Sequence, residues 1–244
     1  IHNILKDESR SSSSTRMGRF STSLVVAEIA VSCALLVTSG MMIRSVVNLR
    51  AVDLGFETAG VFTARVGLFE ADYPDDESRR QFFDQLQVRL QAIPGIQHAA
   101  LSTSLPATGT GGASFAAEGE SYATDRDYPS ALRATTTPDF FAAFGVDFRE
   151  GRDFTVQDRD GSLPVAVVNE SFARRYLPDQ SPLGRRIRLG RSQSELPWMT
   201  VVGVVPDLHT AGGGPGGLGS DDARQEIIYT PVAQWPTRFL SIVV

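Results

Sequence analysis

The side chains best able to bind a metal or to act as nucleophiles are few and far apart in this chain. Its 244 residues include three histidines, His2, His98 and His209, and one cysteine, Cys33. A zinc site needs three or four such ligands that converge, and a lone cysteine forms no disulfide within its own chain. The sequence therefore predicts neither a zinc site nor a disulfide framework.

A short acidic run, Asp158-Arg159-Asp160-Gly161, resembles a fragment of a calcium-binding loop. It lacks the further alternating carboxylates and the closing glutamate of such a loop. We interpret the run as a turn exposed to solvent.

Phosphate and acyl-transfer chemistry finds no support either. The glycine-rich segments 109–112 and 212–219 are not followed by Lys-Ser or Lys-Thr, and G-x-S-x-G and S-x-x-K motifs do not occur. Asp207 lies two residues before His209, and we interpret both as ordinary loop residues. We expect no cofactor and no catalysis by this chain, with a membrane-anchored hydrolase as the enzyme alternative.

The elements that position these residues start with an apolar segment at 24–43, 20 residues whose single charge is Glu28. As an α-helix this segment is about 30 Å long, the thickness of a bilayer's hydrocarbon core. A cleaved signal peptide has a shorter apolar region, and a buried helix of a soluble protein is rarely apolar on every side. We therefore expect a transmembrane helix over residues 21–47.

Charge predicts the orientation of this helix. Residues 1–20 carry four basic and two acidic side chains, and basic segments favour the cytosolic side. We expect a cytosolic basic linker at 1–20 and an extracytoplasmic body after about residue 50, although Arg44 and Arg50 weaken the bias. Beyond residue 50 the chain has 17 basic and 25 acidic residues, a net charge of −8. This acidic body argues against binding to nucleic acid.

The predicted span has a face of small residues. Ala30, Ala34 and Thr38 recur every four residues, and Glu28 lies on an adjacent stripe. Small residues let a second helix approach closely, and a carboxylate that faces lipid is costly. These four residues are our candidates for packing against further transmembrane helices. A lone anchor, and a Glu28 side chain that reaches the cytosolic interface, are the alternatives.

Beyond the span, strand and helix patterns are typical of an α+β fold. Residues 57–150 predict a strand at 61–68, a helix after Asp75, strands at 96–104, 115–119 and 130–136, and a short helix at 138–144. Residues 151–225 predict a strand at 165–168, a helix at 170–176, and strands at 187–189 and 199–205; further strands follow at 226–230 and 238–244. Because 151–225 reads as a self-contained unit, we expect a second lobe there, inserted into the sheet of the first.

Several segments resemble a known family. They are SLVVAEIAVSCALLVTSGMMIRSVVNLRAVDLGFETAGVFTARVGL, FFDQLQVRLQAIPGIQHAALSTSLP, GRDFTVQD, PVAVVNESFARRYLPDQSPLGRRIRLG and TVVGVVPDL. In this order, and over nearly the whole chain, they are similar to ABC transporter permeases of the MacB and FtsX-like kind. The opening linker and span further resemble the second half of duplicated members. Since Ile1 stands where a Met would begin a chain, we expect a piece of a longer protein.

The resemblance implies a four-span permease of the bacterial inner membrane, with a periplasmic domain between its first two spans. That domain has two lobes in the family. Residues 57–150 and 226–244 correspond to a porter-like lobe, truncated at its end, and residues 151–225 to a smaller inserted α/β lobe. The family's role is that of a non-catalytic subunit, driven by a separate cytosolic ATPase, that couples to periplasmic conformational change and to export or extraction of a substrate.

The partners that the resemblance implies are the ATPase, further transmembrane helices of the same permease and a periplasmic protein. No motif defines substrate-binding residues, so none can be assigned from the family. A membrane-tethered periplasmic binding or sensor module is the alternative function, because one span and one pocket would be enough for it.

Overall fold

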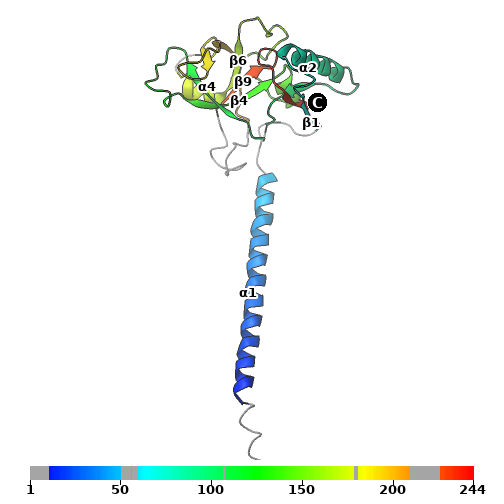
Figure 1. Ribbon diagram of the computed structural model, residues 1–244, viewed down its shortest axis with the longest axis vertical. Coiled ribbons are helices and arrows are strands. Elements are labelled where there is room, and N and C mark those ends of the chain that lie inside the picture. Colours follow the sequence, from blue (N-terminus) through cyan, green and yellow to red (C-terminus); the bar gives the residue numbers. More distant parts are fainter. Residues whose placement is uncertain (1–10, 51–55, 57–59, 107, 179–180, 209–225) are drawn as a thin grey trace, which may run out of the picture. The chain divides into compact units, whose positions relative to one another are not determined.

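The computed structural model describes residues 11–50, 56, 60–106, 108–178, 181–208 and 226–244, and the chain divides into two compact units, Ile1–Val52 and Asp53–Val244. In the first unit, α1 (Ser11–Arg50) is one helix of 40 residues (Figure 1). Residues 11–20, which we expected in a linker, are therefore helical, because extending a helix costs less than starting one. Residues 1–10 of that linker lie outside the described part.

The second unit has ten described strands and three described helices, which confirms the α+β class. The strands are β1 (Thr63–Gly67), β2 (Ala100–Ser102), β3 (Gly112–Ala117), β4 (Ser130–Thr136), β5 (Glu150–Gly151), β6 (Val165–Asn169), β7 (Arg186–Leu189), β8 (Met199–Val205), β9 (Ile227–Pro231) and β10 (Phe239–Val243). The helices are α2 (Asp76–Gln91), α3 (Phe140–Ala143) and α4 (Glu170–Tyr176). Of these, β4, α4 and β8 have the predicted bounds, whereas the two residues of β5 are too few to leave a pattern.

Six strands close into a ring. Each is hydrogen-bonded to the next in the order β4, β3, β7, β8, β6, β9 and back to β4. The β6–β8 and β4–β9 pairs are parallel and the other four are antiparallel. Because side chains alternate across a strand, every second residue faces inward. These inward residues form an apolar cluster, the ring core, which includes Phe115, Ala117, Ala131, Ala166, Val168, Ile187, Leu189, Met199, Val201 and Ile228, together with Phe172 of α4.

A sheet arm branches from the ring where β4 changes its partner. The first residues of β4, up to Leu132, pair with β3, whereas Thr136 pairs with Ser102 of β2. β10 then lies between β2 and β1. Helix α2 begins at the cap residue Asp75, whose carboxylate accepts a hydrogen bond from the Ser78 amide at 2.7 Å, and its Phe83 is buried in the core of this arm.

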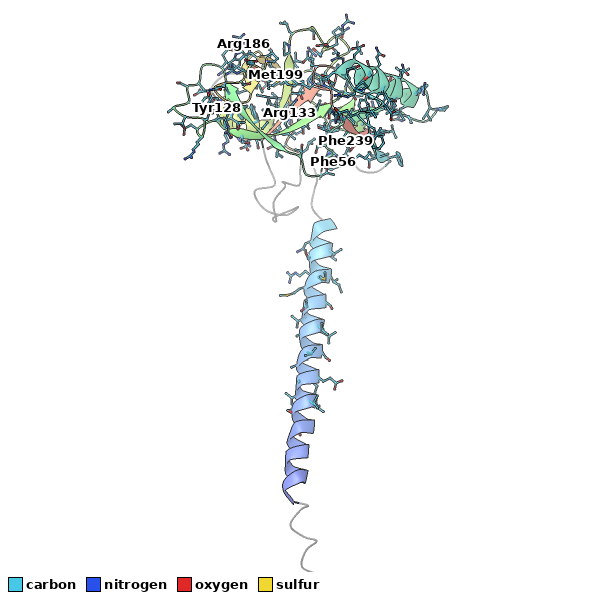
Figure 2. All side chains as sticks on the ribbon, viewed as in Figure 1. Phe56, Tyr128, Arg133, Arg186, Met199 and Phe239 are labelled. Carbon is cyan, nitrogen blue, oxygen red and sulfur yellow. The ribbon has the colours of Figure 1, made fainter. Side chains whose placement is uncertain are left out.

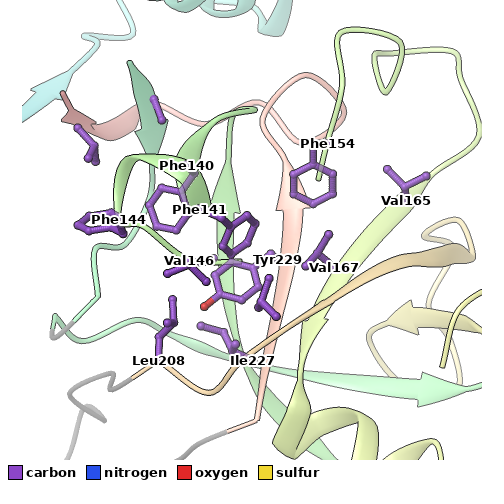
Figure 3. Close-up of a cluster of buried hydrophobic side chains, with 14 residues drawn as sticks. Phe140, Phe141, Phe144, Val146, Phe154, Val165, Val167, Leu208, Ile227 and Tyr229 are labelled. Atoms are coloured by element: carbon purple, nitrogen blue, oxygen red, sulfur yellow. The ribbon is translucent and has the colours of Figure 1, made fainter. Parts of the chain in front are cut away.

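A second apolar cluster covers the outer side of the ring at β4, β6 and β9. Its aromatic side chains come from α3 and the loop after it, from the turn after β5 and from β9 (Figure 3). The rings of Phe141 and Tyr229 meet edge to face, with centroids 5.0 Å apart, and Phe140 contacts Phe144 in the same way at 5.3 Å. The short helix α3 is therefore held by burial of its two phenylalanines, which are at most 1% exposed.

The strand pairings bear on the predicted division into two lobes. β10 pairs with β1 and β2, and β9 pairs with β4, as a chain returning to its first lobe requires. However, β9 also pairs with β6, and β3 pairs with β7, so one sheet runs across both predicted lobe boundaries. These strands share the ring core, and burying their apolar faces together joins the segments. The two-lobe division is therefore not confirmed and stays a prediction.

Candidate functional site

Helix α1 provides the first candidate site, a segment able to cross a membrane. Its residues Thr22–Asn48 have a mean hydropathy of 2.0 over the most apolar window, and none of that window is buried. Leu36 is 72% exposed and Ile43 66% exposed, and Cys33 is exposed as well. Figure 2 shows side chains of α1 projecting outward from the helix along its length. Length and composition suit a bilayer, in which such side chains would face lipid rather than water.

The four predicted packing residues all lie on described turns of α1. The Thr38 hydroxyl donates a hydrogen bond to the Ala34 carbonyl at 2.7 Å, which places both on one face. Glu28, Ala30, Ala34 and Thr38 are exposed, like every side chain described in α1. The hydroxyl is thus satisfied within the helix, and the small face stays available to a partner. Its packing role stays a prediction.

The polar side chains of the second unit are the other place where a metal or catalytic cluster could form. Within the described ranges, no three His, Cys, Asp or Glu side chains converge as a metal site requires. His209 and the glycine-rich segment 212–219 lie outside these ranges. Among the polar side chains that do meet, two local networks lie in segments that carried the family resemblance.

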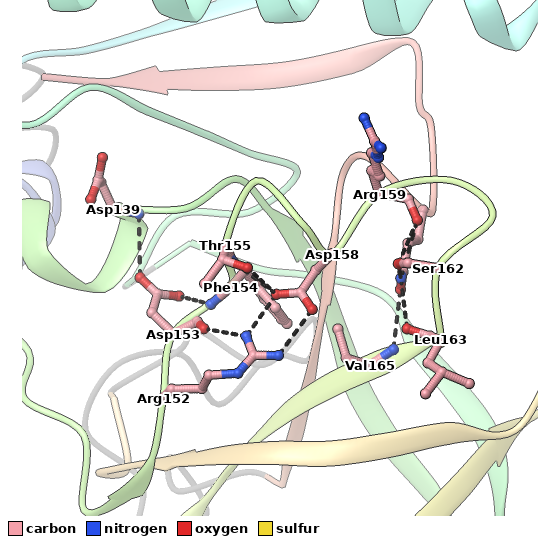
Figure 4. A network of polar contacts seen from close by, with 11 residues as sticks. Asp139, Arg152, Asp153, Phe154, Thr155, Asp158, Arg159, Ser162, Leu163 and Val165 are labelled. Carbon is pink, nitrogen blue, oxygen red and sulfur yellow. Dashed lines mark hydrogen bonds and ion pairs between the residues drawn. The ribbon is translucent and has the colours of Figure 1, made fainter.

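The first network surrounds Asp158 (Figure 4). Its carboxylate accepts hydrogen bonds from both terminal nitrogens of Arg152, at 2.7 and 3.0 Å, and from the Thr155 amide at 2.8 Å. Burial works against the charge of Asp158, but these hydrogen bonds outweigh it and lower the pKa of the carboxyl. The prediction of a solvent-exposed turn is therefore wrong for Asp158, which is 6% exposed, because Arg152 compensates its burial. Asp160, with a side chain 68% exposed, does face solvent.

Next to this ion pair, Asp153 is a carboxyl with little compensation. It accepts the amide of Phe154 at 2.6 Å and that of Asp139 at 3.3 Å. Burial raises the pKa of Asp153 to about 6, because the two amides offset only part of the cost of removing a charge from water.

Gly151 fixes this turn to the ring. Its φ is +77°, a conformation that favours glycine, and it pairs with Gly203 of β8. A Cβ at Gly151 would lie 2.1 Å from the Val202 carbonyl oxygen. The two glycines therefore let the GRDF turn lie directly against β8.

The second network holds the start of α4. Asn169 is the helix cap, and its side-chain oxygen accepts the amides of Phe172 at 3.2 Å and Ile227 at 2.9 Å. The Asp207 carboxylate accepts hydrogen bonds from the side-chain nitrogen Nδ2 of Asn169 at 2.7 Å and from the Ser171 hydroxyl at 2.5 Å. Asp207 is thus no ordinary loop residue, since it ties α4 to the segment that follows β8.

Together these networks join the segments that carried the family resemblance. GRDF is fixed on β8, which is the TVVGVV run, and NES at the start of α4 is tied to PDL. The Asn-Glu-Ser cap was visible in the sequence, whereas the partnership with Asp207 joins residues 38 positions apart and leaves no local signal. Chemically, both networks orient the backbone and bury charge, as structural supports do.

The comparisons with known proteins agree with this picture. The chain matches the family model of the MacB-like periplasmic core domain over residues 22–244. Among curated proteins no sequence matches. The periplasmic region of MacB from Actinobacillus actinomycetemcomitans is similar in structure, with 20% identity and a TM-score of 0.49, over 78% of this chain and 75% of that one.

Two further solved structures are similar at a lower TM-score. A domain assigned to a permease of Porphyromonas gingivalis has 20% identity and a TM-score of 0.44, over 65% of both chains, so this chain spans 65% of its length. The extracellular domain of the ABC-type transporter YknZ from Gram-positive bacteria has 14% identity and a TM-score of 0.42, over 66% of this chain and 71% of that one.

The family match decides the identity. It begins within α1 and continues through the candidate span and the folded unit to the last residue, Val244. The chain belongs to the family of MacB-like periplasmic core domains.

Proposed function

We propose that this chain is a non-catalytic permease part of an ABC-type transporter, which couples a separate cytosolic ATPase to conformational change in the periplasm and to movement of a substrate. The family match over residues 22–244 carries this proposal, because it includes the candidate span as well as the folded unit. If the chain only bound a ligand in the periplasm, its membrane anchor would not need to be part of the region that matches the family.

The proposed topology places residues 1–20 in the cytosol, α1 in the inner membrane and the chain after about residue 50 in the periplasm. The basic excess before the span supports it. Reporter fusions at Ser13 and after Gly161 should report opposite compartments. A membrane-impermeant thiol reagent should not label Cys33 in intact vesicles, and ready labelling from either side would contradict the span.

The partners of α1 in this proposal are further helices of the same permease. Ala30, Ala34 and Thr38 offer a surface without bulky side chains, and Glu28 gains a polar partner on the neighbouring helix instead of facing lipid. A periplasmic protein completes the assembly on the far side.

Coupling requires that movement of α1 reaches the folded unit. Only 12 residues, 51–62, separate the end of α1 from β1, and a short connection transmits a tilt better than a long one. We expect a ten-residue Gly-Ser insertion between Arg50 and Glu57 to uncouple the two units.

The test uses the complete permease and its ATPase in nanodiscs. A fluorophore on E120C, in a C33S background, reports the ATP-dependent response of the folded unit, since Glu120 is exposed. The insertion should abolish this response while ATP hydrolysis continues. The same insertion at Gly161, an exposed turn, is the matched control and should leave the response intact. An undiminished response after the junction insertion would favour the tethered binding or sensor module.

A further inference from the structure

A cavity lies at the place where β4 leaves β3 and joins β2. Its volume is about 510 Å³, and it is lined by Thr103, residues 109–113, Arg133, Thr135 and residues 235–237; we call it the fork pocket. The Arg133 amide donates to the Gly111 carbonyl at 2.9 Å, and the Thr103 amide donates to the Thr135 carbonyl at 2.9 Å. Backbone hydrogen bonds to two diverging strands therefore frame the pocket and fix its width.

The inner face of β4 changes character towards this pocket. Ala131 belongs to the ring core, and alternation puts Arg133 and Thr135 on the same face. The Thr135 hydroxyl lies 3.1 Å from the hydroxyl of Thr230 on β9, and Trp235 packs against the ring core from the pocket side. The ring is thus apolar in its middle and polar at this end.

Arg133 forms no ion pair with an acidic side chain among the described residues. Its guanidinium stacks on the Trp235 ring, 4.6 Å from the ring centroid, and its Nε is buried with no hydrogen-bond acceptor in the described part of the chain. Burial lowers the pKa of Arg133, and no carboxylate of the described residues raises it. An arginine still keeps its charge under these conditions, so its positive charge is uncompensated within the described part of the chain.

Two other residues that line the pocket, Trp235 and Thr103, also carry hydrogen-bond donors. The Trp235 Nε1 is buried without a partner among the described residues. The Thr103 oxygen accepts the Thr135 amide at 2.8 Å, and its hydroxyl can also donate to a ligand, since Thr103 lines the pocket. Buried polar groups are normally paired, so this excess of donors calls for an oxygen-bearing anion.

We propose that the fork pocket binds a ligand through a carboxylate, which the guanidinium of Arg133 holds beside Trp235. Charge favours a carboxylate over a phosphate, because Arg133 is the one charged residue among the described residues that line the pocket and compensates a single negative charge. The planar guanidinium fork also matches a carboxylate in two parallel hydrogen bonds. The volume suits a small organic acid or the last residues of a peptide. This site is independent of the transport proposal.

The chain has a matched control for Arg133. Arg188 on β7 stacks on Trp198 at 5.1 Å, and its Nε is likewise buried without a partner in the described ranges. Neither Arg188 nor Trp198 lines the fork pocket. A general effect of anions on stacked arginines would appear at both pairs, whereas a bound carboxylate would appear at Trp235 alone.

The test is ¹⁹F NMR of the full chain in detergent micelles, with both tryptophans labelled as 5-fluorotryptophan and the W198F variant used to assign the two signals. N-acetylglycine supplies a carboxylate, and N-acetylglycinamide is its neutral analogue. We expect the acid to shift the Trp235 signal saturably and to leave the Trp198 signal in place, and we expect no shift with the amide. R133Q should weaken binding about ten- to hundredfold, the usual range for loss of a charged hydrogen bond, whereas R188Q should bind as the parent does.

Two further measurements keep the result clear if R133Q folds poorly. R133K keeps the positive charge but loses the planar guanidinium, and it should bind the acid weakly but measurably. T103V keeps the guanidinium and should lose part of the affinity. Tri-alanine and its C-terminal amide test the peptide source, and either source supports the carboxylate. Equal shifts with acid and amide, tighter binding of inorganic phosphate, equal responses of both tryptophans, or no Trp235 shift at 50 mM acid would each overturn the proposal.

Discussion

Helix α1 and the ring of strands are made from the same aliphatic residues but expose them in opposite ways. Val37 in α1 is 61% exposed, whereas Val167 and Val168 in β6 are completely buried. In α1 the apolar residues follow one another on every side of the helix, while in the ring they alternate with other side chains or meet a second layer.

The difference shows that hydrophobic content predicts removal from water but not the medium that replaces it. A continuous run of 20 residues matches a bilayer, and short alternating runs match a protein interior. Substitutions of one kind should therefore have different effects in the two regions.

The largest expected effect comes from removing a core aromatic residue. Phe141 is completely buried and contacts Phe140, Phe148 and Tyr229, so Phe141→Ala should lower the free energy of unfolding of the second unit by about 3–5 kcal/mol. Leu36→Ala in α1 should leave it unchanged. Urea unfolding of the full chain in micelles, followed by near-ultraviolet circular dichroism, measures both, and equal losses would break the comparison.

A smaller effect is expected from removing a charged side chain that is buried in the folded unit. Asp158→Ala removes an acceptor of several partly buried hydrogen bonds and should cost about 1–3 kcal/mol. Asp160→Ala, two residues along, should have no measurable effect, since its contact with Arg80 is at the surface. The same unfolding assay at pH 7 compares them, and a similar cost at both positions would mean that the turn is solvated throughout.

The pH dependence of stability tests the uncompensated carboxyl of Asp153. Its folded pKa of about 6 is above the ordinary aspartate pKa of 3.8, so between these values the folded state holds a proton that the unfolded state has lost. Stability should therefore fall as the pH rises through this window and level off above it.

Asp153→Asn should remove this dependence and stabilise the protein at pH 7.5 by about 1 kcal/mol, with little effect at pH 4. Thermal unfolding midpoints of both proteins across pH 4 to 7.5 provide the measurement. A variant destabilised at pH 7.5 would show that the carboxylate makes a contact worth more than its burial costs.

The smallest effect is expected from a substitution in α1, because side chains of this helix become packed only if a second helix lies against it. Ala34→Leu should weaken association with further spans of the permease by about 1 kcal/mol, and Val25→Leu, on the opposite face of the helix, should not. Fluorescence energy transfer between labelled spans in nanodiscs measures this. Equal behaviour of the two variants would support a lone anchor.

Local patterns predicted the elements of this fold well. The apolar run of β8 was enough to predict that strand, the stop at Pro178 helped to predict α4, and uninterrupted apolarity was enough for the candidate span. The ring was not predictable, because β4 and β9 pair across about 95 residues and their partnership leaves no local trace. The same reason hides the fork pocket, since Arg133 meets Trp235 only after the ring closes.

The position of β10 has a consequence for how the protein is made. This strand ends at Val243 yet lies between β1 and β2, which are made much earlier. During synthesis β1 has no described strand beside it until β10 emerges, so the arm cannot form progressively along the chain. A protease present during synthesis should therefore find β1 unprotected until residue 243 has been made.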